Sequence, residues 1–186
     1  ASDKYADIAV LKIDKDKIIS VAEIGSTEKA RLGDTVFTIG GPLSDEYSWT
    51  VTRGIVSGKD RLVEVSVTNS GSADWVMSVL QTDASINSGN SGGPLANANG
   101  EVIGVTNMKL VSSGVEGMGF AIPIEDAVNY ADQLIEEGKI ARPLLGVSMG
   151  SVQDAYSLYH YGINLDNSIS EGVVVVIGSH PHVVRQ

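Results

Sequence analysis

The sequence predicts a mainly β protein with one α-helix toward its C-terminal end. Glycine supplies 21 of the 186 residues. The apolar stretches are short, are rich in Val, Ile and Thr, and alternate with turn residues. Such a composition favours short strands separated by tight turns. Only one segment places its apolar residues at helical spacing.

Six stretches have the composition of strands, and each lies between Gly, Pro, Asn or Asp residues. The turn sequence Asn97-Ala98-Asn99-Gly100 is typical of a hairpin and leads into one of them. The six predicted strands are residues 8–13, 35–39, 49–57, 76–82, 101–107 and 119–122.

A helix is predicted between Pro123 and Gly138. Glu125 and Asp126 lie in its first turn and Lys139 lies just past its end, which is the order of charges that the helix dipole favours. We expect this helix to pack on the β core. Its apolar residues at helical spacing are Ile124, Ala127, Val128, Ala131, Leu134 and Ile135.

A domain boundary is predicted after the helix. Ala141-Arg142-Pro143 resembles a hinge, and residues 143–186 carry a new apolar pattern that includes four consecutive valines from Val173. We expect one domain over residues 1–140 and the beginning of a second over residues 141–186.

Composition excludes several functions. The net charge is −10, from 13 Lys and Arg against 23 Asp and Glu. Nucleic-acid binding needs clustered basic residues, so we expect no nucleic-acid partner. The longest purely apolar run, residues 173–177, is far shorter than the ~20 residues of a membrane helix.

Metal and redox sites receive little support from the sequence. The absence of cysteine excludes disulfides, thiolate zinc sites and cysteine nucleophiles. His180 and His182 are near in sequence, but two imidazoles without a third ligand make a weak metal site. We expect neither a metal nor a cofactor.

Ser91 is the strongest candidate for a reactive residue. It lies in the glycine-dense turn GNSGGP, residues 89–94, between two predicted strands. An acyl-transfer nucleophile must stand clear of its backbone while nearby N–H groups converge on the developing oxyanion. Gly89 permits the unusual dihedrals that this needs, and the N–H groups of Gly89 and Ser91 are the candidate donors.

Three alternatives compete with this interpretation. A simple turn would explain three or four such residues more easily than it explains six. A phosphate-binding loop would end in Lys followed by Ser or Thr, and no Lys follows here. The stretch also satisfies G-x-S-x-G, the elbow of α/β-hydrolases, and all three histidines lie downstream. That elbow leads into a helix, whereas residues 94–105 predict a turn and a strand.

Further stretches occur in a familiar order along the chain. They are DIAVLK at 7–12, LGD at 32–34, IGGP at 39–42, TVTRGIVS at 50–57, VIGV at 102–105 and GFAIP at 119–123. Together with QTDASINSGNSGGPL at 81–95, they resemble trypsin-like serine proteases of the HtrA/Deg type over roughly residues 5–147. The resemblance implies the second β-barrel of the chymotrypsin fold, the last strand of the first barrel, and one helix.

The resemblance also implies roles for individual residues. Ser91 matches the nucleophile and Asp7 the acid that orients the base. Gly89, Asn90 and Ser91 match the oxyanion loop. Asp83 is interpreted as a turn-capping carboxylate.

A substrate pocket is implied beside this loop. Ser85 stands six residues before Ser91, where trypsin-type basic specificity has Asp, and Ile86 follows it. With Asn107 and Met108 they imply a small uncharged pocket for aliphatic side chains, although core packing explains Ile86 about as well.

The sequence departs from the family at two points. Ser88 stands where the family commonly has Pro, and the three histidines, His160, His180 and His182, all follow Ser91. The family order is His, then Asp, then Ser. We therefore expect that the residues were cut from a longer endopeptidase whose histidine lies upstream, and that the 186 residues alone do not hydrolyse peptides at an enzymatic rate.

The tail resembles the beginning of a PDZ domain. Leu145, Gly146 and Val147, within LLGV, are similar to its carboxylate-binding loop. The match weakens from Ser148 onward, so we expect an incomplete module that does not bind peptides.

Family resemblance implies the biological setting. It implies a protein quality-control protease that cleaves misfolded or unfolded polypeptides and peptides, anchored or secreted outside the cytoplasm of a bacterium. A trimeric homo-oligomer is implied, and a mostly missing first barrel favours a strand-exchanged assembly. The alternative is a non-catalytic module that uses the protease barrel to bind peptides.

Overall fold

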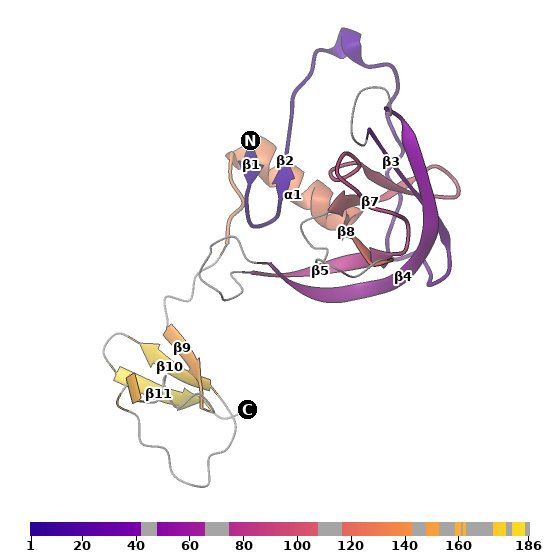
Figure 1. The fold of residues 1–186 in the computed structure, drawn as a ribbon. Coiled ribbons are helices and arrows are strands. Elements are labelled where there is room, and N and C mark those ends of the chain that lie inside the picture. Colours follow the sequence, from indigo (N-terminus) through magenta and orange to yellow (C-terminus); the bar gives the residue numbers. More distant parts are fainter. Residues whose placement is uncertain are drawn as a thin grey trace. The chain divides into compact units, whose positions relative to one another are not determined.

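The chain folds into two compact units, Ala1–Ala141 and Arg142–Gln186 (Figure 1). The computed structural model describes residues 1–41, 48–65, 75–107, 117–142, 148–152, 159–160, 162, 173–177 and 180–184. No helix in these described residues is both long and apolar enough to cross a membrane.

The first unit is built around a closed antiparallel barrel. Its strands follow the order β3-β4-β5-β8-β7-β6, and β3 closes the barrel by pairing with both β4 and β6. Figure 1 shows the long, curved β4 sweeping around one side. The strands are β3 (Thr35–Gly40), β4 (Thr50–Val65), β5 (Trp75–Thr82), β6 (Pro94–Asn97), β7 (Val102–Asn107) and β8 (Gly119–Pro123).

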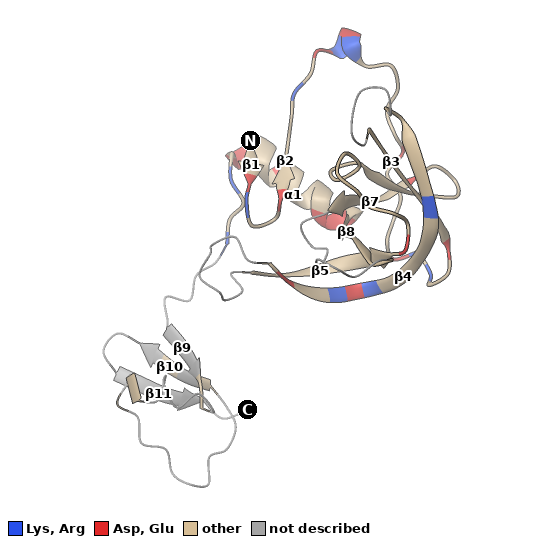
Figure 2. Ribbon diagram, in the orientation of Figure 1, with Lys and Arg blue, Asp and Glu red and all other residues tan. Residues whose placement is uncertain are grey.

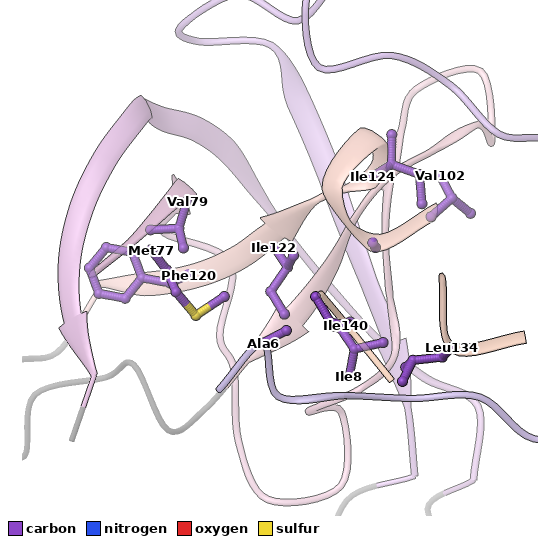
Figure 3. Close-up of a cluster of buried hydrophobic side chains, with 11 residues drawn as sticks. Ala6, Ile8, Met77, Val79, Val102, Phe120, Ile122, Ile124, Leu134 and Ile140 are labelled. Atoms are coloured by element: carbon purple, nitrogen blue, oxygen red, sulfur yellow. The ribbon is translucent and has the colours of Figure 1, made fainter. Parts of the chain in front are cut away.

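Two apolar clusters stabilise this unit. In the first, each of the six barrel strands contributes one buried residue, namely Val36, Val56, Leu80, Leu95, Ile103 and Ala121. The second joins the barrel to the N-terminal hairpin and the helix (Figure 3). Because side chains alternate along a strand, neighbouring residues such as Ile103 and Val102 serve different clusters.

The helix α1 (Ile124–Glu137) follows β8 directly. Gly138 ends it in the left-handed conformation, with φ 73°, and its N–H donates to the Leu134 carbonyl at 3.1 Å. Glu125 accepts two hydrogen bonds from Thr27, one from the backbone N–H at 2.8 Å and one from the hydroxyl at 2.6 Å. The segment before the barrel is thus tied to the start of α1.

The remaining elements are short. The strands β1 (Ser2–Asp3) and β2 (Ile8–Ala9) form an antiparallel hairpin, and η1 (Lys15–Lys17) is a 3₁₀ turn.

The second unit contains β9 (Ser148–Ser151), β10 (Val173–Ile177) and β11 (His180–Val184), with β10 in the centre. Basic positions of the first unit are scattered over separate segments (Figure 2).

The mainly β fold with a barrel and a helix is confirmed, with corrections to three strands. The strand expected at 8–13 covers only Ile8–Ala9, because Leu11 and Ile13 are exposed and no described strand pairs with them. The strand expected at 49–57 continues to Val65. Residues 94–97 form a strand that the sequence did not predict, since it begins at Pro94.

Candidate active site

Ser91 lies exposed on the turn between β5 and β6. The turn needs glycine on both sides of it, because Gly89 has φ 109° and Gly92 has φ 83°. Residues with a Cβ rarely adopt such backbone dihedral angles. The backbone of this turn therefore depends on the glycines that the sequence places around the hydroxyl.

Asn90 anchors the turn inside the end of the barrel. It is only 3% exposed, and its amide Nδ2 donates to the Thr38 hydroxyl at 3.0 Å and to the Ser85 carbonyl at 2.9 Å. Its Oδ1 accepts from the Asn87 N–H at 2.8 Å. The backbone N–H of Asn90 donates to the Asn87 carbonyl at 3.2 Å, so Asn90 holds the Ser91 turn through hydrogen bonds of its backbone and its side chain.

The end of β3 lies against the same turn. The Gly41 N–H donates to the Gly89 carbonyl at 3.0 Å. A Cβ at Gly40 would lie 2.6 Å from the Asn90 Cβ and 2.6 Å from the Gly89 oxygen. Since real Cβ contacts are not this short, only glycine fits at position 40.

The last two residues of β7 contact the two halves of the site. The Thr106 hydroxyl donates to the Asn90 carbonyl and, at 3.1 Å, to the Gly93 carbonyl. The next residue, Asn107, donates from Nδ2 to Asp7 Oδ2 at 2.9 Å. Successive side chains of a strand point in opposite directions, so one strand end supports both the Ser91 turn and Asp7.

Asp7 is held in a constrained position between β1 and β2. Its φ of 52° is in the left-handed region, which non-glycine residues seldom occupy. Asp3 Oδ1 accepts the N–H groups of Tyr5 at 3.0 Å and Ala6 at 2.8 Å, which fixes the hairpin turn. Ala6 and Ile8, on either side of Asp7, are buried in the second apolar cluster (Figure 3).

Two of the predicted pocket residues lie beside barrel strands, Ile86 against β8 and Ser85 against β4. Ile86 is half-buried, and a Cβ at Gly119 would lie 2.7 Å from its Cδ1. Ser85 is exposed, and its carbonyl accepts from the Thr52 hydroxyl at 2.9 Å as well as from Asn90. Asp83 Oδ1 accepts the N–H of Ile55 on β4 at 2.7 Å, so Asp83 bonds a neighbouring strand and its turn-capping role stays a prediction.

The remaining candidates have different outcomes. Asn107 faces Asp7, and its expected substrate contact stays a prediction. Met108, and the loop of Leu145, Gly146 and Val147, lie outside the described residues. The three histidines, His160, His180 and His182, all belong to the second unit.

Threonines are the residues that sequence reasoning missed. Thr38 and Thr106 are buried and bond the Ser91 turn, and the Thr38 and Thr52 hydroxyls are 2.6 Å apart. A polar residue at an inward position of an otherwise apolar strand was the available signal.

The arrangement is suited to acyl transfer. An exposed hydroxyl lies on a turn that several hydrogen bonds hold, and backbone N–H groups lie on the same turn. The Asp7 carboxylate accepts a hydrogen bond from Asn107 of β7, the strand that also supports the turn. A nucleophilic serine requires these parts together with a base.

Comparison with known proteins relates the chain to peptidases. A family model described as a trypsin-like peptidase domain matches residues 1–105. Serine protease Do-like HtrB of Bacillus subtilis is 45% identical over 177 residues, which are 94% of this chain and 38% of that protein. Serine protease Do-like HtrA of the same organism is 46% identical over 161 residues, which are 87% of this chain and 35% of that protein. The chain thus spans well under half of these relatives.

Comparison with solved structures also finds proteases of the HtrA type. The HtrA-type protease AlgW with decapeptide superposes with a TM-score of 0.71 at 35% identity, covering 94% of this chain and 49% of that one. Deg5 superposes with a TM-score of 0.59 at 36% identity, covering 75% of this chain and 60% of that one.

Proposed function

The chain belongs to the trypsin-like peptidase family, as an HtrA-type member, and we propose that it is part of a longer serine endopeptidase that cleaves unfolded or misfolded polypeptides. The observation that carries the proposal is the shared support of Ser91 and Asp7 by β7. A module that only binds peptides would have no need of a carboxylate fixed in this way.

The proposed reaction uses Ser91, the backbone N–H groups of its turn and a base. The Ser91 Oγ attacks the scissile carbonyl carbon while a base takes its proton, and the carbonyl oxygen becomes an oxyanion. The backbone N–H groups of Gly89 and Ser91 stabilise this charge. Collapse expels the amine, which takes the proton from the base, and leaves an acyl-enzyme on Ser91. Water then releases the acid by the same steps.

The base is a histidine from outside these 186 residues. Asp7 accepts a hydrogen bond from Asn107, and its carboxylate is the group that would orient the imidazole. The three histidines of this chain all follow Ser91 in sequence, whereas the family order places the base first. The match covers only 38% of HtrB, so a protein of similar length has many further residues that could include the base.

The cellular role and location that we propose are those that the family resemblance implies. We expect a quality-control protease outside the bacterial cytoplasm, acting as a homo-oligomer. AlgW, with its bound decapeptide, supports peptides as the substrate class.

Covalent labelling tests the proposal. The longer protein and the 186-residue chain are incubated with a fluorophosphonate and their intact masses are measured, beside Ser91→Ala variants. We expect one label on the longer protein, none on the Ser91→Ala variant, and slow labelling of the chain alone. A longer protein that binds peptides but is not labelled would be a non-catalytic binder, and rapid labelling of the chain alone would show that its base lies within it.

A further inference from the structure

Trp49 is an exposed aromatic residue with an uncommon backbone. It is 83% exposed and has φ 67° just before β4 begins. Bulky residues seldom adopt the left-handed region, and such outliers concentrate at functional sites. A fold would ordinarily place Gly or Asn at such a position.

The residues on either side of Trp49 connect it to the Ser91 turn. Ser48 lies against Gly41, where a Cβ would be 3.5 Å from the Ser48 Cα, and the Gly41 N–H donates to the Gly89 carbonyl. Thr50 pairs with Gly40, and a Cβ added at Gly40 would lie 2.6 Å from the same Gly89 oxygen. Trp49 is therefore at the rim of the barrel next to the oxyanion loop.

The barrel order identifies the side of the site on which Trp49 lies. In the closed order β3-β4-β5-β8-β7-β6, β3 and β8 are three strands apart and thus opposite each other. Ile86, which lines the predicted pocket for the acyl side chain, contacts Gly119 of β8, whereas Trp49 adjoins the end of β3. With the acyl side chain assigned to the β8 side of the barrel, the opposite side, at β3, is the side left for the leaving group of a peptide.

We propose that Trp49 is a specificity-determining residue that contacts the first residues on the leaving-group side of the scissile bond and selects apolar or aromatic side chains there. This assignment rests on the proposed endopeptidase function. An indole offers a large, rigid apolar surface at small entropic cost, which suits recognition of such side chains.

The test uses the longer protein and two series of peptides with a common acyl half. One series carries Phe or Leu in the first two leaving-group positions and the other carries Gly or Ser. Trp49→Asn removes the indole and suits the left-handed backbone. Trp49→Phe retains an aromatic ring, and Leu62→Ala, at an exposed position farther along β4, is the matched control.

We expect Trp49→Asn to lower the apolar-to-polar ratio of kcat/KM about three- to tenfold. Trp49→Phe should retain most of the ratio, Leu62→Ala all of it, and fluorophosphonate labelling of Ser91 should be equal in all variants. An unchanged ratio with normal labelling overturns the assignment and leaves the proposed function standing. An equal loss for both series together with slower labelling indicates a structural role and also overturns it. An unlabelled wild-type protein overturns the proposed function and this assignment with it.

Discussion

The Asn107 amide donates to the Asp7 carboxylate at 2.9 Å, although 100 positions separate the two residues. Asp7 lies on a hairpin outside the barrel, and Asn107 ends a barrel strand. This bond fixes the direction of the carboxylate relative to the Ser91 turn.

Removal of this bond should slow the chemistry of Ser91 without unfolding the barrel. We expect Asn107→Ala in the longer protein to lower the rate of fluorophosphonate labelling about ten- to hundredfold, because a hydrogen bond to a charged group contributes about 1.5–3 kcal/mol. Asn107→Ser, which retains a donor, should restore part of the rate, and the pH profile of labelling should shift with Asn107→Ala. Asn99→Ala, on an exposed turn, is the control. Equal rates and pH profiles in all variants would contradict a positioning role.

The sequence could predict those features of the site that are local. The glycines around Ser91 and the caps of α1 act within a few residues, so their patterns are visible along the chain. The inward bonds of Asn90 and the contact of Asn107 with Asp7 arise only when the barrel closes. Periodicity contains no information about pairs so distant in sequence.

The same reasoning explains the strand errors. Gly58 and Asp60 predict a turn after Ser57, yet β4 passes through both with shifts of register, and Asp60 has φ 53°. Such irregularities increase the twist and let one long strand curve around a barrel. Gly58 and Asp60 do interrupt the regular strand, but in the folded barrel the interruption is a β-bulge and not a turn.

Asn90 should be essential for the stability of the turn. Asn90→Ala leaves its three partners, Thr38, Ser85 and Asn87, without the bonds that they make to it. Thr38 and the Ser85 carbonyl keep their bonds to Thr52, so the cost is that of the three lost hydrogen bonds at about 1 kcal/mol each, and we expect a loss of ~3 kcal/mol in the free energy of unfolding. Chemical denaturation of the 186-residue chain measures this loss. Asn99→Ala should change the free energy by less than ~0.5 kcal/mol, and equal values for the two variants would contradict the anchoring role.

Two adjacent glycines should differ in how well they tolerate a methyl group. A Cβ at Gly40 would lie 2.6 Å from the Asn90 Cβ, whereas at Gly41 its nearest neighbour is the Ser48 Cα at 3.5 Å. We expect Gly40→Ala to destabilise the chain by about 3 kcal/mol and to slow Ser91 labelling, because the turn must shift. Gly41→Ala should cost less than about 1 kcal/mol. Similar losses for both variants in denaturation experiments would show that the turn does not rest on β3 as described.

Glu125 and Asp126 should affect stability with opposite dependence on pH. Burial raises the pKa of the Glu125 carboxyl, but hydrogen bonds from Thr27, Ser26 and its own backbone outweigh this and lower it below 4.5. Burial and the nearby charge of Glu125 raise the pKa of the Asp126 carboxyl above 3.8. Ionised Glu125 therefore stabilises the fold above pH 4.5, and this contribution is lost as the pH falls through the lowered pKa. For Asp126 the contribution is complete below pH 3.8 and is lost as the pH rises through the raised pKa.

The two pKa shifts have opposite directions, so replacing each carboxylate by its amide should change the free energy of unfolding in opposite directions. At pH 7, Glu125→Gln should be less stable than the wild type and Asp126→Asn more stable, and both differences should shrink as the pH falls toward 3. Denaturant unfolding of the 186-residue chain from pH 3 to 7 measures them. The Glu125→Gln difference should also be reduced in a Thr27→Val background, since Thr27 supplies two of the bonds to the carboxylate. Losses of equal sign at pH 7, or a Glu125→Gln effect independent of Thr27, would show that the carboxylate does not hold residues 23–30 to α1 through Thr27.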